Sequence, residues 1–435
     1  MTKSYRYPAD CTSIIDVTKA PYNADNTGKV DCTKILCQIV DDVLGAYEKR
    51  FYETDAKLSA MDDPNALISF EIRKIDGRKN VIFPEELPPS KIIYFPKGTY
   101  LVSDTISYSM EEFRNFLSSL RHLEMNAQLR FMGENMDETI IKLQDNCKGF
   151  EHGNDRPVIS FMQGEASNIA MTNMLENLTI SVGKGNPGAT GVRYFANNTG
   201  AIRNVRIISE DPEFRGNTGF SVLHEKVSAC LVQNVEIVGF NYGIKSMPQF
   251  LYTTFEHITL RNQKRCGIYA GNTVTSIRDL KSFNEVPDLR MEGMIGLVSL
   301  IDAEFYGGSP LETAIRHQYG YCFLRNIKSE GYEYIMRQDM CYMQTPSVKD
   351  YLSEYCSHGP CTLFEQEDAT SLNLPVEETP EVKWDDPEDW VSVNSFGAKG
   401  DGITDDTAAI QSAIDFAAKR LKTAEDKFYM NIERY

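Results

Sequence analysis

The sequence has 435 residues, a formal net charge of −17 at pH 7, and 42% hydrophobic and 25% charged residues. A chain of this length can bury a large core, in two or three average domains or in one elongated repeat domain. The acidic balance argues against a nucleic-acid ligand, because phosphate binding needs a basic surface. No apolar run reaches the length of about 18 residues that a membrane-spanning helix needs, so no membrane association is predicted.

The N-terminus and the cysteines bear on localisation. Residues 1–8 lack the apolar core of a signal peptide. We therefore expect a cytoplasmic protein, or a chain from which a signal was removed. The ten Cys residues form no CxxC pair and no zinc-finger spacing. We expect reduced, mostly buried thiols, with no metal site and no cofactor.

The first element in chain order is a helix. Residues 33–52 have apolar side chains at positions 35, 36, 39, 40, 43, 44 and 47, the spacing of an α-helix with one buried face. Residues 91–102 follow as a strand, a Pro-Gly turn and a second strand. A helix ahead of the first strands can cover the open edge of a β-structure. The pattern therefore predicts an N-terminal capping helix.

The middle of the chain repeats with a period near 25 residues. Each repeat contains a glycine followed by an apolar residue, and an Asn or His before a short alternating segment. The glycines are Gly191, Gly219, Gly243 and Gly267, and the second series is Asn177, Asn204, Asn234 and His257, with Asn326 as a later member. Short strands at this period, with no helices between them, indicate stacked coils of parallel β-strands.

The recurring Asn suits a turn between strands. Asn tolerates a left-handed backbone, and its amide can hydrogen-bond to the next coil along a ladder. A β-sandwich is the alternative, but its strands usually recur about every 8–12 residues. The prediction is an all-β chain that forms a parallel β-helix, a solenoid, with an N-terminal cap.

One segment occurs twice. The second copy, residues 393–415, follows an acidic stretch with three prolines at 364–390 that is typical of a linker. Gly28, Asp31 and Thr33 of the first copy align without gaps with Gly402, Asp405 and Thr407, all offset by 374 positions. The glycines allow a tight turn, and the Asp suits the N-cap of the helix that follows. These six residues are therefore expected to be structural.

Residues 393–415 closely resemble the opening segment of pectate-lyase-like β-helices, which implies a right-handed, single-stranded β-helix. Two tandem opening segments are similar to those of glycoside hydrolase family 55, whose members carry two β-helices and cleave β-1,3-glucans from one end. Segments 94–100, 185–191, 301–308 and 326–332 also resemble that family. The resemblance extends over about residues 14–418 and implies a polysaccharide or oligosaccharide ligand.

The chain departs from that family in its second half. We expect a capped β-helix over 1–363, a linker over 364–390, and only the truncated start of a second β-helix over 391–435. In the family, the catalytic acid and much of the substrate cleft lie in the second β-helix. The resemblance thus matches the N-terminal half of the enzyme, and a second β-helix domain or subunit is a possible partner.

Glycoside hydrolysis needs a protonated carboxyl and usually a second carboxylate. Asp302 and Glu304 are two residues apart in one expected strand, so they are predicted to share a face and are the catalytic candidates. Both also fit the ordinary role of solvated outer carboxylates. Four tyrosines of the coils are candidates for stacking on sugar rings, although most aromatic residues fill a core. These are Tyr194, Tyr242, Tyr269 and Tyr306.

Three functions remain open at this point. The first is a family-55-like glycoside hydrolase acting on a neutral β-glucan, which the acidic net charge favours over a polyanion. The second is a glycan-binding or scaffold module without catalysis. The third is a pectin-active lyase or hydrolase of the wider superfamily. The Gly-His-Gly of polygalacturonases and the carboxylate cluster of a calcium-dependent lyase are absent from the repeats.

Overall fold

The computed structural model describes a large part of the chain in two compact units, with the boundary between Leu374 and Pro375. The described residues are 7, 11, 13–59, 71–75, 78–82, 91–108, 128–161, 170, 172–223, 230–247, 252–338, 348–359, 363–364, 370–378 and 390–423.

A 14-stranded sheet forms one side of the first unit. Its main path runs through eleven strands, parallel to one another except at the last pair, β22–β24, and three further strands branch from it at β10. The main path is β1 (Ile14–Asp16), β5 (Ile92–Phe95), β7 (Arg130–Gly133), β10 (Met174–Ser181), β12 (Gly200–Ile208), β14 (Cys230–Val238), β16 (Tyr252–Arg261), β18 (Val274–Phe283), β20 (Leu297–Tyr306), β22 (Tyr321–Ser329) and β24 (Tyr351–Cys356), and the branch is β2 (Thr27–Asp31), β6 (Gly98–Val102) and β8 (Thr139–Leu143).

An eight-stranded parallel sheet forms the opposite side of the coils. Its strands are short and alternate along the chain with the long strands of the first sheet. They are β9 (Arg156–Ser160), β11 (Ala189–Arg193), β13 (Thr218–Val222), β15 (Tyr242–Ser246), β17 (Cys266–Ala270), β19 (Leu289–Met291), β21 (Thr313–His317) and β23 (Tyr334–Gln338). A separate antiparallel pair is formed by β3 (Glu71–Ile75) and β4 (Arg78–Ile82).

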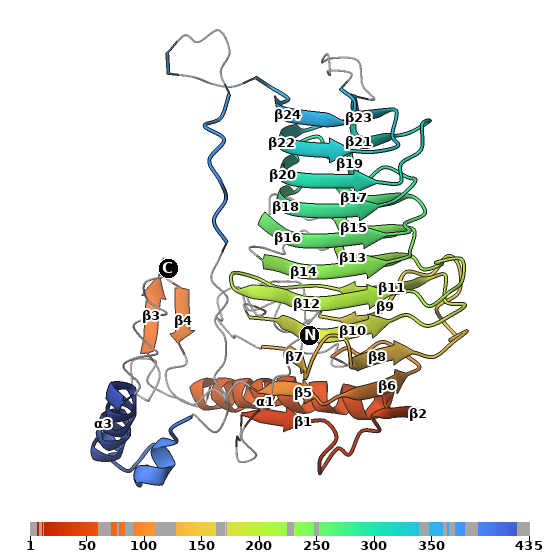
Figure 1. The fold of residues 1–435 in the computed structure, drawn as a ribbon. Helices are drawn as coiled ribbons and strands as arrows, with labels where there is room; N and C mark the ends of the chain where they lie inside the picture. The colour runs from red at the N-terminus through yellow and green to blue at the C-terminus, as the bar shows by residue number, and fades with distance from the viewer. Residues whose placement is uncertain are drawn as a thin grey trace. The chain divides into compact units, whose positions relative to one another are not determined.

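Each coil therefore consists of one short strand, a loop, one long strand and a second loop. Successive coils stack in parallel register, as Figure 1 shows. The predicted right-handed parallel β-helix is confirmed. The repeated glycines mark the short strands, because Gly191, Gly219, Gly243 and Gly267 each follow residues that pair in register across β11, β13, β15 and β17.

Every long strand from β10 to β22 bends at one residue with a left-handed backbone, with φ between 50° and 58°. These residues are Asn177, Asn204, Asn234, His257, Asp279, Asp302 and Asn326. Side chains join neighbouring coils at this corner. The amides of Asn204 and Asn234 donate to the residue one coil earlier, over 2.9 and 2.6 Å. The predicted Asn ladder is therefore present over Asn177, Asn204 and Asn234, and further pairs at the same corner join His257 to Asp279 and Asn326 to Asp302.

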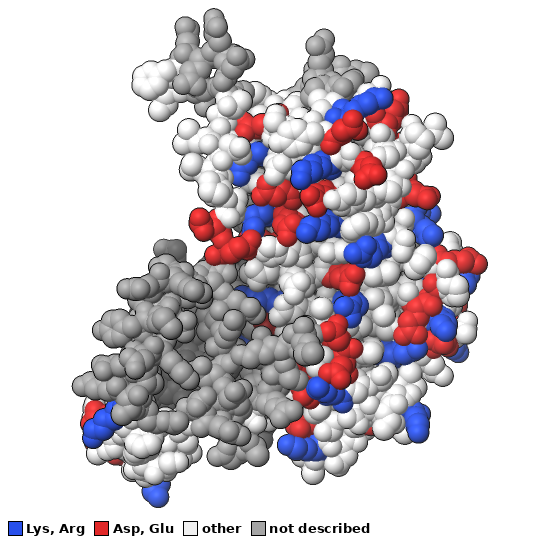
Figure 2. All heavy atoms as spheres, in the orientation of Figure 1, with Lys and Arg blue, Asp and Glu red and all other residues white. Residues whose placement is uncertain are grey.

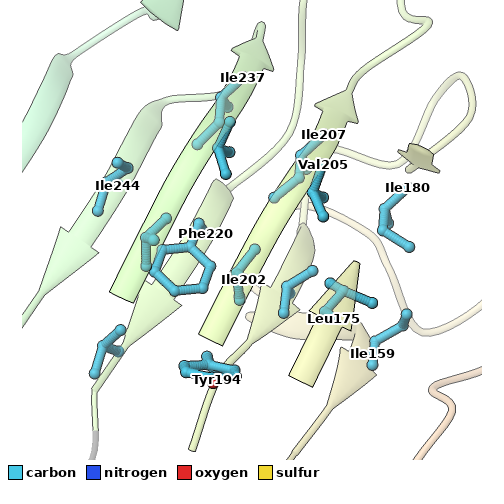
Figure 3. Close-up of a cluster of buried hydrophobic side chains, with 14 of the residues drawn as sticks. Ile159, Leu175, Ile180, Tyr194, Ile202, Val205, Ile207, Phe220, Ile237 and Ile244 are labelled. Carbon is cyan, nitrogen blue, oxygen red and sulfur yellow. The ribbon is translucent and has the colours of Figure 1, made fainter. Parts of the chain in front are cut away.

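The core lies between the two sheets, where inward side chains from both meet (Figure 3). A file of aromatic rings runs through it from coil to coil, with consecutive ring centroids 5.3–6.4 Å apart. The rings are Phe95, Phe131, Phe161, Tyr194, Phe220 and Phe255. Edge and tilted contacts at such distances stabilise the stack beyond simple burial.

The helix α1 (Thr33–Ser59) begins at the predicted residue and lies across the first coil (Figure 1). Leu36, Ile39 and Val40 are at most 1% exposed and join the core. Asp31 caps the helix, since its Oδ1 accepts from the Thr33 amide (2.9 Å) and hydroxyl (2.6 Å). The apolar face predicted from the sequence is thus the face that closes the β-helix.

The second unit contains a 3₁₀ turn, η3 (Val393–Phe396), and the helix α3 (Thr407–Thr423). Asp405 makes the same capping contact to Thr407 that Asp31 makes to Thr33, at 3.0 and 2.5 Å. Gly402 is left-handed, with φ 70°, like Gly28, with φ 74°. The two copies of the motif therefore adopt one local structure. That residues 391–435 begin a second β-helix stays a proposal.

The described cysteines are free thiols. Among the helices that the structure describes, none is long and apolar enough to cross a membrane.

Candidate functional site

Asp302 and Glu304, the predicted catalytic pair, lie on β20, but the bend at Asp302 separates them. Asp302 is the corner residue, with φ 58°, and its Oδ1 accepts a hydrogen bond of 2.7 Å from the Asn326 amide. Glu304 lies on the segment beyond the corner, where its two oxygens face Lys328 Nζ at 3.3 Å and the Tyr306 hydroxyl at 3.1 Å. The expected strict alternation fails at this bend, and both carboxylates take part in contacts between or within coils.

Tyr306 stacks on Phe283 of the preceding coil, with ring centroids 5.2 Å apart and planes inclined by 19°. Its hydroxyl donates to Glu304, which raises the pKa of the phenol. Arg261 covers the other end of this file, with its guanidinium carbon 4.0 Å from the Phe283 centroid. These side chains form a file of contacts on the outer face of the long strands.

Tyr194 is a core residue. It is 1% exposed, and its hydroxyl donates to the Asn173 carbonyl over 2.7 Å. Burial raises the pKa of this phenol well above its usual value. Its ring belongs to the internal aromatic file (Figure 3), so the prediction that Tyr194 binds a sugar is wrong.

Tyr242 and Tyr269, in contrast, lie together on the outer face of the eight-stranded sheet. Their rings meet edge to face, with centroids 6.1 Å apart. The Tyr269 hydroxyl donates to Glu292 over 2.8 Å, and burial together with this carboxylate raises the pKa of Tyr269 to about 12. Tyr242 and Tyr269 are both half-buried.

The register of the short strands places a row of basic side chains beside these tyrosines. Arg193, Ser221, Lys245, Tyr269, Arg290 and Arg316 are consecutive partners on β11, β13, β15, β17, β19 and β21. Their neighbours within each strand, such as Ile244 and Ile268, point into the core and are fully buried. We call Arg193, Lys245, Arg290 and Arg316 the basic row.

Three members of the basic row have carboxylate partners. Arg193 faces Asp155 at 3.2 Å, Arg290 is paired with Glu292, and Arg316 faces Glu312 at 2.6 Å. Each guanidinium is therefore held in place and its charge partly offset.

Lys245 differs from these three cations. Its Nζ lies 4.2 Å from the centroid of Tyr242, and no carboxylate of the described residues pairs with it. The pKa of Lys245 is lowered, chiefly by burial and further by Arg265 and Arg193, while Asp155 opposes the shift. A half-buried ammonium without an ion-pair partner is costly in a folded protein unless a ligand completes it.

The basic row was missed at the level of the sequence, although a signal for it exists. Arg193 and Lys245 of the basic row, and the residues in register with them, Ser221 and Tyr269, each stand two positions after the repeated glycine of their strand. Because these positions pair across coils, they form one column, in which Ser221 is buried and the other three side chains are partly exposed. Aligning the repeats on glycine would therefore have revealed two cations and a tyrosine in register.

The outer face of the long strands has a different charge pattern. Basic and acidic side chains alternate over it (Figure 2). Arg206 and Arg261 both pair with Glu236, at 2.8 and 3.2 Å, and Lys328 pairs with Glu304. These ladders largely neutralise one another. Within the described part of the chain, no cluster of three or more His, Cys, Asp or Glu could hold a metal ion.

Fold and register together define a right-handed parallel β-helix protein with a polar, aromatic outer row. The model of the family described as rhamnogalacturonase A/epimerase, pectate lyase-like, matches residues 17–288 and 390–428, more than half of the chain. The chain belongs to this pectate-lyase-like family of carbohydrate-active β-helix proteins. The narrower resemblance to glycoside hydrolase family 55 stays a proposal.

Several solved structures are similar to this chain in fold. ORF18 of Geobacillus virus E2 is 14% identical (TM-score 0.32; 74% of this chain and 62% of that one). The Agl-KA catalytic domain is 11% identical (0.42; 78% and 57%), and the A-module of the Azotobacter vinelandii mannuronan C-5 epimerase AlgE4 is 11% identical (0.22; 73% and 96%). This chain thus spans less than two thirds of the first two. All three TM-scores are below 0.5 and have no weight in assigning a function. No curated protein matches the chain.

Proposed function

We propose that this chain binds a polysaccharide along the outer face of the eight-stranded sheet, at Tyr242, Tyr269 and the basic row. The observation that carries the proposal is the register of outward side chains on consecutive short strands. Neighbouring parallel strands are about 4.8 Å apart. A polymer lying along the coil axis therefore meets an equivalent position at each coil, at intervals comparable to one sugar unit.

The chemistry of the face supports a sugar ligand. Half-buried tyrosines offer an apolar ring edge and a polar tip, which suits the mixed surface of a pyranose. Carboxylates and guanidiniums fixed by ion pairs, such as Glu292 with Arg290, provide oriented acceptors and donors for hydroxyl groups.

A hydrolytic activity on β-1,3-glucan remains part of the proposal. Glu292 and Glu312 of this face are the carboxyls available there for acid and base roles. Asp302 and Glu304 lie on β20 of the other sheet and could act only on a sugar bound along the long strands. A binding module without catalysis is the alternative, since each of these groups already holds a partner within the fold.

The first experiment measures binding and cleavage together. Laminari-oligosaccharides and oligogalacturonates are titrated calorimetrically, and new reducing ends are assayed after long incubation. Binding of either sugar supports the proposal, and release of new ends makes the chain an enzyme. Absence of binding to both, at millimolar sugar, would contradict it.

Two variants locate the site. Tyr269→Ala on β17 should weaken binding about 10-fold, because one stacking ring is worth roughly 1–2 kcal/mol. Tyr306→Ala on β20 is the matched control and should leave affinity unchanged. The reverse pattern would place the sugar on the long strands instead.

A further inference from the structure

Four consecutive long strands carry a column of exposed apolar side chains at their first residues. Tyr252, Val274, Leu297 and Tyr321 are register partners on β16, β18, β20 and β22. Tyr252, Leu297 and Tyr321 are 41–61% exposed, and Val274 is half-buried. Single exposed apolar side chains are ordinary on a protein surface, but a contiguous group of them marks an interaction surface.

The column is one edge of a larger surface on the first halves of these strands. Every second residue of each half-strand points outward, since those between them, such as Phe255 and Leu300, are fully buried. We call the outward set the β16–β22 face. Its twelve residues are Tyr252, Thr254 and Glu256 of β16, Val274, Ser276 and Arg278 of β18, Leu297, Ser299 and Ile301 of β20, and Tyr321, Phe323 and Arg325 of β22.

The apolar column reads nearly the same in both directions along the coil axis. Aromatic rings stand at its two ends and aliphatic side chains in the middle. If a second copy faces it with the coils in reverse order, β16 lies over β22 and β18 over β20 of that copy. Tyr252 then meets Tyr321 of the partner subunit, and Val274 meets Leu297 of the partner subunit. Such a surface is complementary to itself, as an isologous dimer requires.

The charged residues of the β16–β22 face fit the same arrangement. Glu256 lies over Arg325 of the partner subunit, and Arg278 lies over Ile301 of the partner subunit. Among the twelve side chains, no two like charges meet. The other two-fold arrangement keeps the order of the coils and reverses the strands, which would place each charge over the apolar column of the other copy. Charge complementarity therefore favours the reversed order of coils.

We propose that a second copy of this chain binds the β16–β22 face, about a two-fold axis that runs parallel to the strands between β18 and β20. The eight-stranded sheets of the two copies then lie on the outer sides of the dimer. The inference is therefore independent of sugar binding at those sheets.

The size of the face sets the strength that we expect. Four strands about 4.8 Å apart, with half-strands of five residues at about 3.3 Å each, cover roughly 300 Å². Exposed apolar side chains at its border add to this area, namely Met294 and Ile295 in the turn before β20, and Leu374, whose carbonyl accepts from Arg325 over 3.2 Å. Each partner buries about 800 Å² in a typical stable complex, so the dimer should be weak and reversible.

The first test is sedimentation velocity of the whole chain at increasing concentration. We expect a monomer at about 1 µM and a growing dimer fraction towards about 100 µM, the range of affinity that suits a small interface. Leu297→Glu should raise the dissociation constant at least about 10-fold, because it buries one uncompensated charge on each side of the axis.

A matched variant controls for the added charge. Leu311→Glu introduces the same carboxylate at an exposed leucine between β20 and β21, outside the β16–β22 face. It should dimerise like the unsubstituted chain. Both leucines are exposed, so both variants should keep the unfolding midpoint of the parent, which verifies that a lost dimer does not reflect a lost fold.

Cross-linking tests the orientation of the two copies. Thr254→Cys and Phe323→Cys chains are mixed and treated with a thiol-reactive cross-linker that spans about 10 Å, the distance between packed sheets. The reversed order of coils predicts a 254–323 link between chains, identified by mass spectrometry. Neither variant alone should link at its new cysteine, because equivalent positions of the two copies are also offset by about three coils, roughly 14 Å.

Three results would overturn the inference. A chain that stays monomeric up to about 100 µM would show that another partner, or none, covers the face. A dimer that Leu297→Glu leaves intact would lie on a different surface. Links between identical cysteines, without the mixed link, would exclude the reversed order of coils.

Discussion

Asp288 is a fully buried carboxyl group with a raised pKa. It lies just before β19, fully buried, and accepts hydrogen bonds from Ser282 and from the Asn284 amide (3.3 Å). Burial raises its pKa to about 7, although Ser282, Tyr332 and Asn284 stabilise the anion in part. The carboxyl is therefore protonated in the folded chain at pH values where an unfolded chain has released the proton.

This gives a pH dependence of stability with a definite sign. Between pH 4 and pH 7 the folded state holds one more proton than the unfolded state at Asp288, so its contribution to stability falls as the pH rises and is constant above pH 7. Asp288→Asn should raise the free energy of unfolding at pH 8 by on the order of 1 kcal/mol or more, because it removes a buried charge. At pH 4.5 the two proteins should be nearly equal. Urea unfolding at both pH values measures this, and an equal difference at both would contradict it.

For single residues, the sequence predicted which of them belong to the coils. It did not predict whether a given side chain points into the core or outward. Tyr194 and Tyr269 both lie near a repeated glycine, yet one fills the internal aromatic file and the other faces outward. Their different places in the coil, after a short strand and within one, decide this. Locating strand ends to a single residue is beyond the periodicity alone.

At the scale of the elements, the sequence predicted most of the left-handed residues at which the long strands bend. Four members of the ladder and a later one, Asn326, were found from their spacing. Asp279 and Asp302 were missed because the series was followed through Asn and His only, and Asp302 was assigned to catalysis instead. Asp tolerates the left-handed backbone as Asn does, but it can only accept hydrogen bonds when ionised. A repeat with a period near 25 residues should therefore be searched for Asp as well as for Asn at the corner position.

Variants of Asn204 can separate the stability that comes from the side-chain hydrogen bonds of the ladder from the cost of its left-handed backbone. Its side chain donates to Asn177 over 2.9 Å, accepts from Asn234 over 2.6 Å, and its φ is 54°. Asn204→Ala should destabilise the β-helix by about 2–4 kcal/mol, from two hydrogen bonds and a strained backbone. Asn204→Gly should lose only the hydrogen bonds and cost about 1–2 kcal/mol. Chemical unfolding distinguishes them, and an Ala variant no worse than the Gly variant would show that the left-handed backbone costs nothing here.

The two copies of the opening motif provide a matched pair of helices. Leu36 of α1 is 1% exposed, whereas its equivalent in α3, Ile410, is 44% exposed. Leu36→Ala should reduce the free energy of unfolding of the β-helix by about 2–5 kcal/mol, because it opens a cavity under the cap. Ile410→Ala should change it by less than about 0.5 kcal/mol. Similar losses in the two variants, measured by thermal unfolding, would mean that α3 has a stabilising role that its exposure does not suggest.

For the whole molecule, sequence reasoning predicted the architecture and did not find the face that we propose binds sugar. The repeats determined the stacked coils, because each coil must share its core with its neighbours. The net charge of −17 favoured a neutral ligand, yet acidic residues such as Glu236 are paired with cations on the long strands, and the basic row lies on the other sheet. A sum over the chain cannot report such a local arrangement, whereas the coil register can.

The most direct measurement is protection of lysines from chemical labelling by the bound sugar. The chain is treated with an amine-reactive reagent with and without a saturating oligosaccharide, and the labelling rate of each lysine is followed by mass spectrometry. Lys281 and Lys328 on the long strands, with side chains 49% and 61% exposed, serve as internal controls. If sugar binds the outer face of the eight-stranded sheet, labelling of Lys245 should slow at least about 10-fold while both controls keep their rates. Protection of Lys281 or Lys328 with Lys245 unaffected would place the ligand on the other sheet and contradict the proposed site.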